Sequence, residues 1–171
     1  MIITNNEEAL RVKCTNALPD EISPIIDRLD KELQYSAALG REGLGLAAVQ
    51  IGIPKNVAIV RLENYRFNLV NAKIRQGYDK AIFESEGCLS FPGRYERTMR
   101  FQEIIVDNEV EPYSFIATGL LAVVCLHEID HTDGILLPDI ALKEIKTIKK
   151  LRPNDLCNCG SKIKFKKCCG K

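Results

Sequence analysis

The order of apolar and polar residues along the chain predicts three helices. In the first, apolar residues recur three and four positions apart, at Ile22, Ile25, Ile26, Leu29 and Leu33. Ser23-Pro24 suits the start of this helix. A second helix is expected from Thr118 to His131, because residues 119–126 are uniformly apolar and indicate a buried helix. A third is expected from Asp139 to Leu151, with apolar Ile140, Ile145 and Ile148 and exposed lysines.

Short apolar runs predict β-strands at residues 57–60, 67–74, 104–106 and 113–116. We expect the strands to pair in an antiparallel manner. The pattern therefore predicts an α+β fold, with mostly antiparallel sheets around the central helix of residues 118–131.

Charge is distributed unevenly along the 171 residues, whose net charge is only +1. Residues 1–140 hold 14 basic and 21 acidic side chains, a balance of −7, and residues 141–171 hold 10 and 2, a balance of +8. No apolar run approaches the ~20 residues that span a membrane. The first residues lack the basic and apolar regions of a secretory signal. We expect a cytoplasmic protein with no membrane partner, one main domain and a small basic appendage.

The two histidines of the chain stand four residues apart in His127-Glu128-Ile129-Asp130-His131. On an α-helix such residues share one face, with Cβ atoms ~5–6 Å apart, so both imidazoles can bind one divalent metal. Glu128 would lie beside a metal-bound water. A match of this kind also occurs by chance. Burial of these polar groups is unfavourable, however, unless something pairs with them, and the pattern favours a hydrolase that uses a metal-activated water.

The third ligand of such a metal site must be a cysteine or a carboxylate, because no other histidine is available. Cys125 is badly placed, about 200° around the helix from His127 at ~100° per residue. Cys14 is expected to be a small buried apolar residue. Cys88 follows Gly87, which lets backbone approach closely. We favour Cys88, while Cys14 and several carboxylates stay open.

Three segments together resemble the peptide deformylase family. Residues 43–50 match its G-x-G-x-A-A-x-Q motif, residues 86–90 match E-G-C-L-S, and residues 127–131 match H-E-x-D-H. They occur in the family's order, and the resemblance spans roughly Leu10 to Leu137.

The resemblance implies three metal ligands, Cys88, His127 and His131. Glu128 would take a proton from the metal-bound water and later give one to the leaving amine, and the Gln50 side chain and Leu89 N–H would stabilise the oxyanion. The implied reaction removes the N-formyl group from the initiator methionine of a nascent polypeptide and releases formate. The family typically uses Fe(II), with zinc, nickel or cobalt as substitutes, and a thiolate ligand suits that metal.

A pocket for the methionine side chain is also expected. Its candidate residues are Leu44, Gly45, Gly87, Leu120, Val123 and Val124. The last three precede His127 by seven, four and three residues and so share its helix face, while Leu44 would close the other wall. The alternative is that these are simply core residues.

Four positions depart from the family pattern: Val49, Ala72, Leu126 and Thr132. Leu126 stands in place of a usual glutamine, Thr132 in place of a common leucine, and the other two replace frequent prolines. None is a proposed ligand or base. They therefore put in doubt the orientation of the ligands and the turnover rate rather than the type of reaction.

A second metal site is predicted near the end of the chain. Two closely spaced pairs of cysteines are separated by eight residues, namely Cys157, Cys159, Cys168 and Cys169. Their spacing suits one structural zinc held by four thiolates, whose negative charge nearby lysines would compensate. Two disulfides are the alternative. We divide the chain into a deformylase-like domain, 1–151, and a zinc-binding tail, 152–171.

The tail resembles the SEC-C motif, which also ends the motor ATPase of bacterial protein export and serves there as a docking tag. The resemblance implies a docking partner, either the ribosome or an export-related chaperone. A basic tail would be attracted to ribosomal RNA. A role in folding alone is the alternative, because so small a module has almost no core without its metal.

Two other classes of function stay open. In one, a catalytically weak domain would serve as a binding module and the tail would recruit a partner. In the other, the helix motif would belong to a peptidase, but the chain lacks a third histidine, and the glycine-rich and Cys88 segments would go unexplained.

Overall fold

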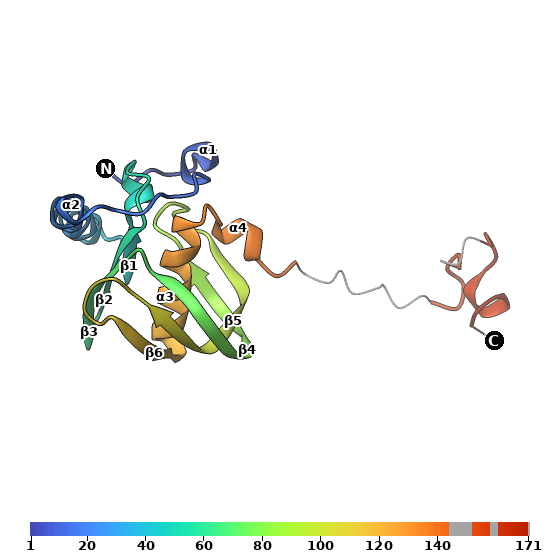
Figure 1. The fold of residues 1–171 in the computed structure, drawn as a ribbon. Helices are drawn as coiled ribbons and strands as arrows, with labels where there is room; N and C mark the ends of the chain where they lie inside the picture. Colours follow the sequence, from blue (N-terminus) through green and yellow to red (C-terminus); the bar gives the residue numbers. More distant parts are fainter. Residues whose placement is uncertain (144–151, 158–160, 171) are drawn as a thin grey trace.

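A computed structural model describes residues 1–143, 152–157 and 161–170. Within them, two three-stranded antiparallel sheets lie beside one central helix (Figure 1). The first sheet has the order β1-β2-β3, formed by Gly45–Ala47, Val57–Leu62 and Tyr65–Val70. The second has the order β4-β5-β6, formed by Lys73–Gly87, Tyr95–Asp107 and Ser114–Thr118. The predicted α+β class with antiparallel sheets is confirmed.

The described helices are α1 (Glu7–Leu10), α2 (Pro19–Ala38), α3 (Gly119–Thr132) and α4 (Leu137–Ile140), with 3₁₀ turns η1 (Ala48–Ile51) and η2 (Phe165–Lys167). Helix α3 confirms the predicted buried helix and contacts strands of both sheets. Its apolar residues share a core with Ala58 and Val60 of one sheet and Ile104 and Val106 of the other. The helix is thereby held from both sides. No described helix is long and apolar enough to cross a membrane.

Helix α2 packs on the first sheet and begins earlier than predicted. It starts at Pro19 rather than at Ser23-Pro24. Pro19 occupies the first helical position, where no N–H is needed, and the Glu21 side chain accepts a hydrogen bond from Leu18 N–H at 2.8 Å. Pro24 lies inside the helix.

The predicted strand over residues 67–74 is wrong, because it joins two strands. β3 ends at Val70 and β4 begins at Lys73. Asn71 between them has a left-handed φ of 49°, and its side chain accepts a hydrogen bond from Ala17 N–H at 2.8 Å. The other three predicted strands coincide with β2, part of β5 and most of β6, whereas β1 was not predicted.

The predicted helix over residues 139–151 agrees with α4 only at Asp139 and Ile140, and it is wrong over residues 141–143. Helix α4 ends at Ile140, Ala141 forms an antiparallel bridge with Thr98, and Leu142 N–H donates to Arg97 O at 2.7 Å. Residues 144–151 lie outside the described residues. After Ile140 the chain therefore pairs with the edge of β5 and does not continue as a helix.

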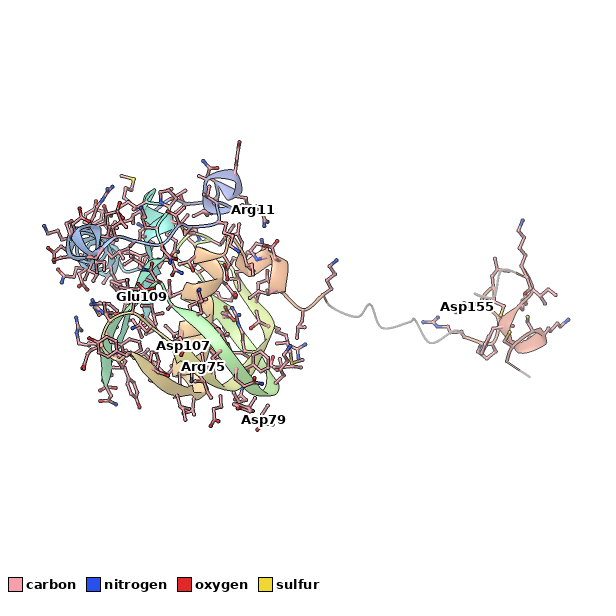
Figure 2. All side chains as sticks on the ribbon, in the orientation of Figure 1. Arg11, Arg75, Asp79, Asp107, Glu109 and Asp155 are labelled. Atoms are coloured by element: carbon pink, nitrogen blue, oxygen red, sulfur yellow. The ribbon has the colours of Figure 1, made fainter. Side chains whose placement is uncertain are left out.

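An ion pair holds α4 against the start of the chain. Arg11 Nη1 donates to Asp139 Oδ2 at 2.7 Å, and Arg11 Nη2 donates to Glu7 Oε2 at 2.6 Å (Arg11 is labelled in Figure 2). Both hydrogen bonds raise the pKa of Arg11. The bond between Arg11 and Asp139 also lowers the pKa of Asp139. Helices α1 and α4 are therefore tied together at the end of α3.

Candidate active site

Three predicted ligands meet at the end of α3. His127 and His131 lie one turn apart with ring centroids separated by 4.8 Å. Cys88 directly follows the last residue of β4, and its Sγ atom is 3.2 Å from Nε2 of His131. The Sγ atom and one ring nitrogen of each histidine all lie within 4.8 Å of one another. Neither Cys14 nor Cys125 belongs to this group, and Cys125 is fully buried in the core.

This donor set fits a divalent metal. Two ligands bound tetrahedrally at ~2.0–2.3 Å lie about 3.5 Å apart, close to the separation of Cys88 from His131. His127 Nδ1 lies 2.7 Å from Glu86 Oε1, and because a carboxylate only accepts, that nitrogen carries the proton. The lone pair of Nε2 is thereby free to bind a metal. One thiolate and two neutral imidazoles leave a fourth position for water.

A buried ion pair between Glu86 and Arg100 contacts His127. Glu86 lies in the E-G-C-L-S motif, but no role was predicted for either residue. Glu86 and Arg100 are 3% and 5% exposed, and Arg100 Nε donates to Glu86 Oε2 at 2.8 Å. Arg100 Nη1 also donates to Asp130 Oδ2 at 2.6 Å. Burial would raise the pKa of Glu86, but the hydrogen bonds from Arg100 and His127 outweigh burial and lower it. Glu86 stays ionised and fixes the tautomer of His127.

Glu128 is buried between α3 and β1. A Cβ atom on Gly45 would lie only 2.5 Å from Glu128 Oε1, so the glycine is what allows the carboxyl group to lie there. Oε2 of Glu128 has no hydrogen-bond partner among the described residues. Burial raises the pKa of Glu128 to about 7. A carboxyl group with such a pKa can both accept and release a proton at neutral pH.

The amide of Gln50 is held in one orientation. Its Oε1 accepts a hydrogen bond from Ala47 N–H at 2.8 Å, which turns the NH₂ group toward Ser90 Oγ at 3.0 Å and Cys88 Sγ at 3.7 Å. The 3₁₀ turn η1 sets this geometry, since Gln50 and Ala47 are three residues apart. Ser90, which ends the E-G-C-L-S motif, is fully buried and is a further site residue for which no role was predicted.

A cavity of about 680 Å³ opens beside these groups. All the predicted substrate-binding residues line it, namely Leu44, Gly45, Gly87, Leu120, Val123 and Val124, as do Gln50, Cys88, Leu89, His127 and Glu128. Val123 and Val124 are nearly buried, whereas Leu44 and Leu120 are 43% and 45% exposed. The structure adds Phe83 and Tyr95 to the wall, which no spacing argument had indicated.

The departures from the family pattern lie in buried, satisfied positions. Val49, Ala72 and Leu126 belong to the apolar core. Thr132 is buried, and its hydroxyl donates to Ile129 O at 2.8 Å. None of the four lines the cavity.

The cysteines of the tail also converge. The sulfur atoms of Cys157, Cys168 and Cys169 lie within 4.8 Å of one another. Cys157 N–H donates to Ile163 O at 2.8 Å and Leu156 bridges Lys164, which folds the two cysteine segments together. Cys159 lies outside the described residues. The arrangement fits a thiolate-bound metal.

Comparison with known sequences identifies the family. A sequence model of polypeptide deformylase matches residues 1–147 of the chain. The chain belongs to the peptide deformylase family. A second model, of the SEC-C motif, matches residues 154–171.

Named relatives agree with this deformylase assignment. The peptide deformylase of Heliobacterium modesticaldum is 46% identical over 117 residues, which cover 67% of this chain and 76% of that protein. The enzyme of Syntrophomonas wolfei is 37% identical over 139 residues, covering 80% and 86%. Among solved structures, the deformylase of Synechococcus elongatus in complex with actinonin has 31% identity and a TM-score of 0.74, covering 84% of this chain and 79% of that one.

The peptide deformylase of Thermotoga maritima shares the fold, with a TM-score of 0.74 at 23% identity, covering 84% of this chain and 97% of that one. Family and fold together make the chain a peptide deformylase, an enzyme that removes a formyl group. Peptide deformylases are metalloenzymes that act on formylated nascent peptides.

Proposed function

We propose that Cys88, His127 and His131 hold the catalytic metal, and that Glu128, Gln50 and Leu89 carry out deformylation around it. The observation that carries this proposal is the convergence of one thiol and two imidazoles within 4.8 Å. A divalent metal supplies a water of lowered pKa and polarises the formyl carbonyl. Fe(II) is the proposed native metal, with zinc, nickel or cobalt as substitutes.

Glu128 moves the protons of the reaction. Its carboxylate accepts a proton from the attacking water and passes a proton to the amine of methionine as the C–N bond breaks. The pKa of about 7 that burial gives this group suits both roles. The close contact with Gly45 limits the positions that the carboxyl group can take.

Gln50 and Leu89 stabilise the negative charge that develops on the formyl oxygen. The bond from Ala47 N–H to Gln50 Oε1 keeps the Gln50 NH₂ group beside Cys88. The Leu89 backbone N–H follows Cys88 in the chain and supplies the second donor. Donors fixed before the reaction need no reorganisation when the charge develops.

The substrate is the formyl-methionyl end of a nascent polypeptide. Val123, Val124 and Leu120 form an apolar slot on the helix face that carries His127. Leu44, Gly45 and Gly87 form the facing wall. An unbranched thioether chain suits such a slot. Because nascent chains emerge from ribosomes, we propose that the enzyme acts in the cytoplasm.

Formate release from formyl-Met-Ala-Ser by the metal-loaded, full-length chain tests the catalytic proposal. Glu128→Gln should retain the metal and lose at least about 10³-fold in kcat. Cys88→Ala should lose the catalytic metal and keep one zinc in the tail. A wild-type protein that holds its metal but releases no formate would instead identify a binding module, and cleavage of an unformylated peptide would identify a peptidase.

We further propose that residues 152–171 form a separate zinc-binding tail, beyond a catalytic domain of residues 1–151, that docks on the ribosome. Cys157, Cys159, Cys168 and Cys169 would bind the zinc. The match to SEC-C and the convergence of three sulfur atoms support this. The tail itself holds six basic side chains and one acidic side chain, a surplus that favours ribosomal RNA over an export-related chaperone.

Sedimentation of the full-length chain with ribosomes at increasing salt tests the docking role. Binding should fall steeply with salt, since each phosphate contact releases counterions. Deletion of residues 154–171 should abolish co-sedimentation and leave formate release from short peptides unchanged. Ribosome binding that does not depend on salt, or that persists after the deletion, would contradict docking through the tail. The tail would then be assigned a role in folding alone.

A further inference from the structure

Tyr95 lines the cavity but has no part in the proposed chemistry. It begins β5 and pairs in register with Gly87, the residue before Cys88. A Cβ atom on Gly87 would lie 2.9 Å from Cε1 of Tyr95, so the ring lies directly against the glycine. Tyr95 is nevertheless 70% exposed. Its ring is therefore supported by the backbone next to a metal ligand while most of its surface stays open.

A purely structural role for Tyr95 explains why its ring lies against Gly87, but it does not explain why the ring lines the cavity. An aromatic residue across from glycine in a strand pair stabilises the sheet by covering the bare backbone. Exposed tyrosines are also ordinary, and Tyr113, which does not line the cavity, is 62% exposed. The position of Tyr95 on the cavity wall, opposite the residue that precedes Cys88, is what a structural role leaves unexplained.

The exposed part of the cavity lining includes this ring. Within the cavity, Val123, Val124 and Glu128 are buried. The remaining wall includes two largely exposed segments, residues 40–43 and 92–95. A polypeptide cannot continue into the core, so the residues after formyl-methionine leave across the exposed lining, which includes these two segments. Tyr95 lies at the end of the second.

We infer that Tyr95 binds the two residues that follow formyl-methionine, and gives the enzyme a preference for peptides with apolar side chains there. The inference rests on the proposed function. An open aromatic ring gains most from covering apolar groups, because apolar contact removes its surface from water. The ring makes this contact in the bound substrate and touches no reacting atom, so it should affect KM more than kcat.

Formate release from two peptides of equal length, formyl-Met-Leu-Phe and formyl-Met-Ser-Ser, tests the inference on the metal-loaded, full-length chain. Wild type should prefer the apolar peptide. Tyr95→Ala should lower kcat/KM for formyl-Met-Leu-Phe by about 3- to 10-fold, mainly through KM. The same substitution should leave formyl-Met-Ser-Ser within about twofold of wild type.

Two control variants separate binding from folding. Tyr95→Phe keeps the ring and should keep the preference, and Tyr113→Ala removes an exposed tyrosine outside the cavity and should behave as wild type. An equal loss on both peptides, or no loss on either, would overturn the inference. Release of formate from formyl-Met-Ser-Ser by wild type tests the proposed function separately, so the two can fail independently.

Discussion

Nδ1 of His127 lies 2.7 Å from Oε1 of Glu86, and this contact joins the proposed metal site to a buried carboxylate on β4. Glu86 is in turn bound by the guanidinium group of Arg100 on β5 and by the Thr98 hydroxyl. The orientation of one ligand on α3 thus depends on residues of two strands. Two predictions follow from this chain of contacts, one about metal affinity and one about stability.

Glu86→Gln should weaken binding of the catalytic metal by about 10- to 100-fold. A neutral amide does not hold the Nδ1 proton of His127 as a carboxylate does, so the ring is free to turn. Competition with a chelator, followed by metal analysis, measures the change. Glu84→Gln is the matched control, because Glu84 is on the same strand but exposed and paired with Arg97. Equal metal affinity in Glu86→Gln and wild type would contradict this role.

Arg100→Met should destabilise the fold by about 3–5 kcal/mol, because it leaves the Glu86 carboxylate buried without its partner. The Arg100 and Glu86 side chains are 6% and 4% exposed. Urea unfolding followed by circular dichroism measures the loss. Arg97→Met removes an exposed arginine of the same strand and should change the free energy of unfolding by less than about 1 kcal/mol. Similar losses in the two variants would show that burial of the pair is not what matters.

Residues close in sequence were predictable, and residues joined only by the fold were not. The spacing of His127, Glu128 and His131 follows from helical geometry, and Cys88 stood out because it lies in a recognisable motif. Arg100 is 14 residues from Glu86. The register of β4 and β5 places Arg100 opposite Ala81 and Glu86 opposite Glu96, and the long Arg100 side chain reaches the Glu86 carboxylate from there. No local pattern carries that information.

The secondary-structure errors have similar causes. β1 has only three residues, all buried, so it shows no alternation of apolar and polar positions. β4 has 15 residues, most of them exposed to some degree, and its sequence reads as polar. After Ile140, the apolar spacing still predicts a helix, but Leu142 N–H donates to Arg97 O at the edge of β5 instead. Apolar spacing alone misses such tertiary contacts.

The ion pair between Arg11 and Asp139 should make stability depend on pH in the acid range. The hydrogen bond from Arg11 is the main cause of the lowered pKa of Asp139. A carboxyl group whose pKa is lower in the folded state stabilises fully above its unfolded pKa, ~3.9. That contribution is lost as the pH falls through the folded pKa. The difference in Tm between wild type and Asp139→Asn should therefore be present at pH 6 and shrink at pH 3.

Arg11→Met supplies the control for that measurement. With the guanidinium group gone, the pKa of Asp139 should return toward its ordinary value, and Asp139→Asn in this background should have less effect at pH 6. A difference in Tm that is the same at both pH values would show that the Asp139 charge does not contribute through this pair.

Gly45→Ala should lower kcat by at least about tenfold while the chain still folds. The added methyl group would lie 2.5 Å from Oε1 of Glu128, so the carboxyl group must move away from the position proposed for its proton transfers. Gly77→Ala is a matched control, since its methyl group would lie 2.6 Å from the Phe101 ring. Neither Gly77 nor Phe101 lines the cavity. Both variants should lose some stability, but only Gly45→Ala should lose more turnover than its loss of stability explains.

Steady-state formate release, compared with the Tm of each variant, separates the two effects. If the variants lose activity in proportion to their Tm, the position of Glu128 is not set by Gly45.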